Sequence, residues 1–337
     1  MRESEWLVER FEQRRGHLRA VAYRMLGSLS EADDALQEVW LRLSRSDRSD
    51  IDNLDAWLTT VVGRVCLNML RSRERRREDL VGVRVPDPIV SGEHGIDPAD
   101  EVLLADSVGL ALLVVIETLT PAERLAFVLH DMFAVSFDEI GPMVERSPAA
   151  ARQLASRARR RVQGEAKVPD ADLTEQQEVV DAFFAAARDG DFDRLVGRLD
   201  RDVVLRADDG PDKPPTVLRG AAAVARASLA GVGSGRTLRT ALVNGAPGAV
   251  LLERGRPVSI LGFTVVQGQI AEIDAIRDPE RLRRLISPAS ADKPSTSAAA
   301  LRRQLLGLTL FARGLGRIPD EEVVAPDERE RQPRRRR

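Results

Sequence analysis

The spacing of the apolar residues changes once along this chain, and this change limits the possible architectures more than any other feature. Before it, apolar side chains recur every three or four residues, as in EADDALQEVWLRL at residues 31–43, which is typical of amphipathic helices. Beyond one more helical pair, short apolar runs broken by Gly, Pro and Asn follow, such as PVSILGFTVVQG at residues 257–268, and these indicate strands. The sequence therefore predicts a multidomain chain in which all-α domains precede an α+β domain.

Interruptions of these patterns predict the domain boundaries. Residues 81–100, VGVRVPDPIVSGEHGIDPAD, hold three prolines and three glycines without any period, and we expect a linker over 79–100. Helical domains are expected over 1–78 and 101–166, and the α+β domain over 175–287. The composition of 288–337, rich in Ala, Ser and Pro with an arginine run at its end, indicates a mostly disordered tail.

The composition excludes several classes of protein. A single cysteine, Cys66, excludes an internal disulfide framework and favours a reducing compartment. The charged N-terminal segment does not resemble a signal peptide, and no apolar run approaches the roughly 18 residues of a membrane span. The three histidines are scattered without a cysteine pair, so no metal site and no cofactor are expected. We therefore expect a cytoplasmic location and no membrane partner.

Positive charge is concentrated in SPAAARQLASRARRRV, residues 147–162, although the chain has 53 acidic residues against 51 Lys and Arg. On a helical projection, one face is apolar and the other holds Arg152, Gln153, Ser156, Arg157, Arg159, Arg160 and Arg161. Arg and Gln read base edges in the major groove, and Arg contacts phosphates. Residues 137–144 would form the supporting helix of a helix-turn-helix unit. A solvated basic face, or a helix lying on a membrane surface, remains an alternative for the helix taken alone.

A second polar stripe lies on a helix expected after residue 54. This segment, LDAWLTTVVGRVCLNMLRSRERRRE, is apolar on most faces, and its polar exceptions are Thr60, Arg64, Asn68 and Arg71, spaced by four, four and three residues. They would form one narrow stripe on a helix that is otherwise buried.

Together, the segments at 31–43, 55–78 and 119–162 resemble, in order and spacing, the two helical domains of bacterial extracytoplasmic-function RNA polymerase sigma factors, of the sigma-70 family. The resemblance implies a region 2 helical bundle and a region 4 helix-turn-helix domain, with core RNA polymerase and promoter DNA as partners. It assigns contacts with the polymerase β′ clamp to Asp34, Gln37 and Glu38. It assigns the −10 element to Arg64, Asn68, Arg71 and the loop at 45–53, and the −35 element to Arg152, Gln153, Ser156, Arg157 and Arg160.

Residues 175–287 resemble a cone-shaped SnoaL-type (NTF2-like) domain, which one subgroup of these sigma factors carries at the C-terminus. The linker motif W-L-P-E-P of that subgroup corresponds to residues 84–88, which keep Pro86, Asp87 and Pro88 but lack the Trp. Its D-G-G-G-K motif corresponds to 209–213, with Asp209 and Lys213, and its N-P-D-K-L motif to 278–282, with Asp278. The resemblance implies regulatory contacts between these segments, with activity modulated by the fused domain. Whether a pocket of that domain binds a small molecule is left open.

Two other functions were weighed against this one. A stand-alone helix-turn-helix regulator with a ligand-sensing C-terminal domain would leave the segments at 31–43 and 54–78 without a role. An enzyme would need a base, for which Asp193, Asp208, Asp209 and Asp274 are candidates, and a partner acid. The C-terminal domain has no Tyr and no His, because the only Tyr is Tyr23 and the last His is His130, so we expect no enzymatic activity.

Overall fold

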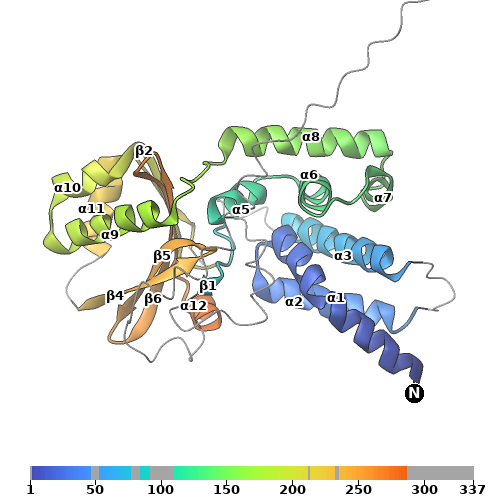
Figure 1. Ribbon diagram of the computed structural model, residues 1–337. Helices are drawn as coiled ribbons and strands as arrows, with labels where there is room; N and C mark the ends of the chain where they lie inside the picture. The colour runs from blue at the N-terminus through green and yellow to red at the C-terminus, as the bar shows by residue number, and fades with distance from the viewer. Residues whose placement is uncertain are drawn as a thin grey trace, which may run out of the picture.

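The N-terminal part of the molecule is a helical bundle. The computed structural model describes residues 2–46, 53–76, 84–91, 109–211, 213–231 and 235–286. The bundle consists of α1 (Arg2–Leu26), α2 (Leu29–Leu43) and α3 (Leu54–Arg76) (Figure 1). Helix α2 begins where the Ser28 side chain accepts the N–H of Glu31, a standard N-cap. Leu36 and Val39 are buried on one side of α2, at the spacing that the sequence predicted.

A second helical unit packs against the bundle. It comprises α5 (Leu110–Glu117), α6 (Pro121–Phe127), a π-helical turn η2 (Val128–Met132), α7 (Phe137–Met143) and α8 (Pro148–Glu165). Thr120, Ser136 and Ser147 cap α6, α7 and α8 by accepting backbone N–H groups in their first turns. In Figure 1, α3 lies directly beneath α6 and α7, and the buried side chains of both units form one continuous hydrophobic cluster.

The C-terminal part is an α+β domain, so the predicted fold class is confirmed. Its sheet has the strand order β1-β4-β5-β6-β7-β2-β3 in the described residues, and β2 and β7 are parallel whereas all other neighbours are antiparallel. The strands are β1 (Val90–Ser91), β2 (Leu199–Asp208), β3 (Thr216–Arg219), β4 (Arg236–Val243), β5 (Ala246–Glu253), β6 (Arg256–Val266) and β7 (Gln269–Ile276). The helices are α9 (Leu173–Asp189), α10 (Phe192–Arg198), α11 (Ala221–Gly231) and α12 (Pro279–Leu285).

Aromatic side chains hold the first of these helices on the sheet. Phe183 and Phe184 of α9 contact Phe263 of β6 edge to face, with ring centroids 5.8 and 5.4 Å apart. All three rings belong to a hydrophobic core that α9, α10 and α11 close over the sheet. This core fills the space between helices and sheet with apolar side chains.

The expected linker contributes a strand to this sheet. Val90 pairs with Val243 and Ser91 with Leu242, so β1 is an edge strand added from the segment between the two helical units. A two-residue strand is too short to show a period, so this pairing could not be predicted.

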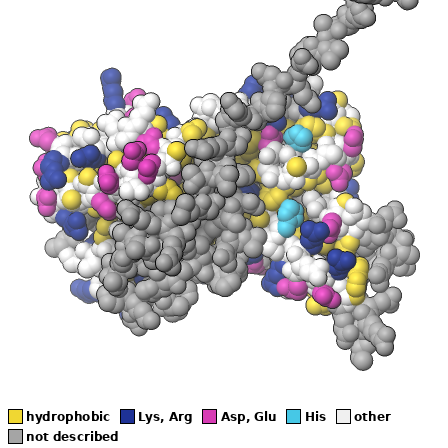
Figure 2. Space-filling view, in the orientation of Figure 1, with side chains coloured by type: hydrophobic (Ala, Val, Ile, Leu, Met, Phe, Trp, Pro, Cys, Tyr) yellow, Lys and Arg dark blue, Asp and Glu magenta, His cyan; other side chains and the backbone are white. Residues whose placement is uncertain are grey.

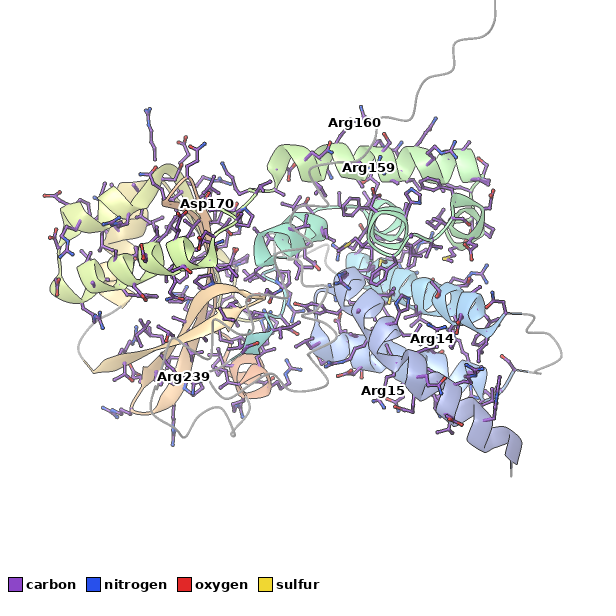
Figure 3. All side chains as sticks on the ribbon, viewed as in Figure 1. Arg14, Arg15, Arg159, Arg160, Asp170 and Arg239 are labelled. Atoms are coloured by element: carbon purple, nitrogen blue, oxygen red, sulfur yellow. The ribbon has the colours of Figure 1, made fainter. Side chains whose placement is uncertain are left out.

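A second connection, from α8 to α9, is also attached to the sheet. The two carboxylate oxygens of Asp170 each accept one backbone N–H of the β6–β7 turn, from Gln267 and Gly268, at 2.8 Å (Figure 3). The N–H of Asp170 donates to the carbonyl of Val265 at 2.9 Å. The short connection between α8 and α9 is therefore hydrogen-bonded to the domain that it precedes. Among the described residues, no helix is both long enough and apolar enough to cross a membrane.

Candidate nucleic-acid interface

Helix α8 presents the arginine face that the sequence predicted. Ala151, Leu154, Ala155, Ala158 and Val162 are buried, while Arg152, Gln153, Arg157 and Arg160 are exposed and Ser156 is half-buried. In Figure 3 the labelled Arg160 points away from the helices beneath α8. A basic, polar surface with Gln among the arginines therefore lies along the outer side of the second helix of a helix-turn-helix unit.

The turn before α8 is tight. Glu145 adopts a left-handed backbone with φ +58°, a conformation that costs a residue with a Cβ about 1 kcal/mol. Gly141 of α7 lies so close to the turn that a Cβ there would meet the carbonyl oxygen of Arg146 at 2.8 Å. The turn therefore places Glu145, a residue with a Cβ, in a left-handed backbone conformation.

Arg159 does not belong to the exposed face, and that part of the helical projection was wrong. Its guanidinium donates from Nε to Oδ1 of Asp131 at 2.8 Å and is turned toward η2, where it is only half exposed. A projection treats each side chain as pointing radially, whereas a long Arg stem bends toward a nearby carboxylate.

Two contacts hold the outer arginines of α8. Arg152 lies over the ring of Phe137, with 5.3 Å from Cζ to the ring centroid. Arg157 donates from Nε to Glu123 at 3.0 Å. Partial burial opposes ionisation of Glu123, but hydrogen bonds from Arg157 and Thr120 outweigh it and lower the pKa of this carboxyl below its usual range. Arg157, Arg160 and Arg161 also line a groove of about 500 Å³ beside Glu123.

The polar stripe of α3 faces the helix-turn-helix unit. Arg64 donates to the carbonyl of Pro142 at 3.5 Å, and Arg71 lies 3.6 Å from Glu145. Gly63 of α3 packs against Met143 and Leu129. A Cβ at this position would lie 3.2 Å from Sδ of Met143 and 3.3 Å from Cδ1 of Leu129. Asn68 is exposed. The surface expected to contact the −10 element is thus partly covered by α7. Most of the expected loop at 45–53 lies outside the described residues.

The residues expected to contact the polymerase clamp share one side of α2. Asp34 and Gln37 are exposed, and Glu38 is half-buried and paired with Arg42 at 2.8 Å. The opposite side of α2 holds the buried Ala35 and Leu36. The helix therefore separates an acidic, polar surface from the bundle core, as the apolar period predicts.

Residues 84–91 lie at the junction of the bundle and the C-terminal domain. Asp87 donates its N–H to the carbonyl of Gly27 at 2.8 Å, and its Oδ2 accepts the N–H of Leu29 at 3.0 Å. Its carbonyl accepts the hydroxyl of Tyr23 at 2.6 Å. Asp87 thereby joins the end of α1 to the start of α2, and Pro86 and Pro88 are buried on either side of it.

On the other side, the C-terminal domain holds the same segment. Asn244, in the β4–β5 turn with φ +51°, donates its N–H to the carbonyl of Ile89 and accepts the N–H of Ile89 through Oδ1, at 2.9 and 2.8 Å. Arg281 of α12, which is 2% exposed, donates to Asp87 at 2.7 Å, to Asp208 at 2.6 Å and to the carbonyl of Val85 at 2.7 Å. One buried guanidinium therefore connects the segment to the sheet.

The other predicted regulatory residues lie next to this contact. Asp278 is the N-cap of α12 and is 7% exposed, and Gly210 approaches its carboxylate closely. Asp209 pairs with Arg277 at 2.8 Å, and Lys213 is exposed. The residues that sequence reasoning missed as contacts are Arg281, Tyr23 and Asn244. Arg281 lies within the expected motif at 278–282 and Asn244 within the segment VNGAPG at 243–248, but no sequence signal marked Tyr23, and the partners of all three are far away in the sequence.

The candidate bases of the C-terminal domain are not gathered into one site. Asp208 and Asp209 pair with Arg281 and Arg277, and Asp193 lies on α10. Asp274 is buried on β7 beside Arg206, at 3.1 Å, and burial raises its pKa to about 6. Among the described residues, no three His, Cys, Asp or Glu side chains are placed to hold a metal ion.

Comparison with known proteins supports the resemblance on which these assignments rest. Residues 10–76 match the model of sigma-70 region 2, and residues 109–162 match that of sigma-70 region 4. The chain is 39% identical over 289 residues to the extracytoplasmic-function RNA polymerase sigma factor SigJ of Mycobacterium tuberculosis, covering 81% of this chain and 92% of SigJ. This chain belongs to the extracytoplasmic-function sigma factors.

Two further comparisons extend over the C-terminal domain of this sigma factor. A probable sigma factor of the same organism, SigI, is 34% identical over 279 residues, covering 80% of this chain and 92% of SigI. The crystal structure of M. tuberculosis SigJ superposes with a TM-score of 0.64 at 36% identity, covering 81% of this chain and 97% of that one. The sigma factor therefore shares both the helical units and the α+β domain with these relatives, and it directs the initiation of transcription.

Proposed function

We propose that this sigma factor binds core RNA polymerase through the outer side of α2 and reads the −35 element with α8 and the −10 element with α3. The observation that carries the proposal is the exposed face of α8, where Arg152, Gln153 and Arg160 project from a helix-turn-helix unit. Arginine forks and a glutamine amide are the groups that contact guanine and adenine edges, while the remaining arginines neutralise phosphates.

The same proposal gives the C-terminal domain a regulatory role. Through Arg281 and Asn244 it holds residues 84–91, and these residues in turn hold the α1–α2 corner through Asp87. The α3 stripe meanwhile contacts the helix-turn-helix unit through Arg64 and Arg71, so separation of the two helical units would free these two side chains for the −10 element. A C-terminal domain that holds the segment between these units controls how easily they separate. No catalytic role is proposed, because three of the four candidate bases are engaged with arginines.

Co-purification with core RNA polymerase, followed by transcription in vitro from a cognate promoter, tests the first part. A helix-turn-helix regulator that acts alone does not associate with the core enzyme. For the regulatory part, the full-length chain is compared with Arg281→Met in the same transcription assay, and Arg283→Met serves as a control on the exposed side of the same helix. A change in transcription for Arg281→Met alone supports control by docking, and equal activity of all three proteins contradicts it.

A further inference from the structure

The C-terminal domain has an open cavity of about 660 Å³ at the end distant from the helical units, where α10, the start of β2 and the β3–α11 junction meet. Its walls include the apolar side chains of Val196 and Leu199, the side chain of Gln269 and the first turn of α11. The lining also includes three arginines, Arg201, Arg219 and Arg226. Leu199 also belongs to the hydrophobic core between the helices and the sheet, and Val196 packs against that core, so the cavity lies at its edge.

The charge of this lining is entirely positive. No carboxylate belongs to it, and within the described part of the chain the three arginines have no ion-pair or hydrogen-bond partner. Asp200 and Asp202 flank Arg201 in the sequence, but neither lines the cavity. Figure 2 shows Lys and Arg side chains interspersed with acidic ones over the end of the domain that holds α9 and α10. Three unpaired guanidinium groups around one cavity therefore differ from the mixed surface nearby.

The backbone adds donors to the same cavity. Gly220 has φ +86°, donates its N–H to Val203, and accepts the N–H groups of Ala223 and Val224, so α11 starts directly after it. The N–H groups of Ala221 and Ala222 have no carbonyl four residues earlier within the helix. These N–H donors and the partial positive charge at the N-terminus of the helix add to the positive potential of the three arginines.

We propose that this cavity binds a phosphate-bearing small molecule. Arg219, Arg226 and the first turn of α11 would hold the phosphate, because guanidinium forks match phosphate oxygens in pairs and remain charged at any physiological pH. Arg201 would supply further charge for a second phosphate. The apolar wall at Val196 and Leu199 favours an organic group beside the phosphate. A concave, partly apolar site suits a small molecule better than the regular backbone of a DNA duplex.

Calorimetric titration of the full-length protein tests the site without a transcription assay. Inorganic pyrophosphate and adenosine monophosphate serve as probes for the anionic and the organic part. Because a hydrogen bond to a charged group is among the stronger ones, Arg219→Gln and Arg226→Gln are each expected to weaken binding about tenfold or more. Arg256→Gln, an exposed arginine without a partner among the described residues, is the matched control and is expected to leave binding unchanged.

A gain of acidic charge gives an independent variant. Ala222→Glu places a carboxylate in the cavity at the start of α11, where acidic residues favour the helix, so the protein should stay folded while binding is lost.

Several results would overturn the proposal. No heat with millimolar probe excludes the site, and equal affinity in all variants indicates an adventitious ion only. Loss of binding in Arg160→Gln instead would locate the anion on α8. If Arg219→Gln and Arg226→Gln weaken duplex DNA binding but not probe binding, this end of the domain contacts DNA.

Discussion

Replacing Arg281 by Met should release the C-terminal domain from the segment at 84–91. Arg281 is the buried cation between Asp87 and Asp208, and its side chain and theirs are 2%, 5% and 9% exposed. The methionine side chain fills most of the same volume but leaves two buried carboxylates without a cation. Removing one partner of a buried ion pair destabilises by about 3–5 kcal/mol.

The lower end of that range applies here. In the variant, Asp87 still accepts the N–H of Leu29 and Asp208 still accepts that of Gly210, both at 3.0 Å. Each carboxylate therefore retains one backbone hydrogen bond, and Asp87 regains full hydration when the domain detaches. Detachment should become easier by about 3 kcal/mol, which corresponds to roughly a hundredfold change in the docking equilibrium.

Native-state hydrogen exchange measures this equilibrium at the right place. The N–H of Ile89 donates to Asn244 of the C-terminal domain, so its protection depends on docking, whereas the N–H of Asp87 donates to Gly27 within the helical bundle. Protection of the Ile89 amide should fall about a hundredfold in Arg281→Met and stay unchanged in Arg283→Met, because Arg283 is exposed on the same helix.

A double variant separates lost packing from unpaired charge. Adding Asp87→Asn to Arg281→Met removes one of the two unpaired carboxylates, so protection at Ile89 should recover by about tenfold. If Arg281→Met leaves the protection of the Ile89 amide within a factor of three of the wild type, the buried ion cluster does not hold the domain, and the reasoning is refuted.

Three further predictions concern the helical units and the sheet. Gly63→Leu should push α7 away from α3 and strengthen binding to a −10 oligonucleotide. Gly197→Leu, at a position where a Cβ meets no neighbour, should leave that binding unchanged. Unchanged binding in both variants would contradict partial covering of the α3 stripe by α7. Arg152→Ala should weaken −35 duplex binding by about 1–3 kcal/mol in a fluorescence titration and relax base specificity, and retained specificity would remove Arg152 from the reading face. Asp274 has a pKa raised to about 6 in the folded state, above its unfolded value, so its favourable contribution is complete below pH 4 and is lost as the pH rises through 6. Urea titrations should show that loss between pH 4 and pH 7 in the wild type and a smaller one in Asp274→Asn, and an equal loss in both would assign it to other groups.

The local elements and their order follow from the amino-acid sequence alone. Apolar residues at helical spacing placed the core side of α2 and of α8, because each helix buries one stripe whatever lies opposite. Capping residues such as Thr120 marked helix starts, since their side chains satisfy N–H groups within three residues. The change to short apolar runs after residue 170 separated the helical units from the α+β domain for the same local reason.

Which partners these elements contact depends on how the folded chain packs. Arg159 lies on the polar side of the projection, yet Asp131 turns it inward. The α3 stripe faces α7, and a segment predicted as a linker becomes an edge strand. Arg281 meets Asp87 across 194 positions of sequence. The periodicity of apolar residues shows which side of a helix or strand is buried. The partner of a buried charge depends instead on how distant segments pack, and the spacing of residues along the chain does not predict that packing.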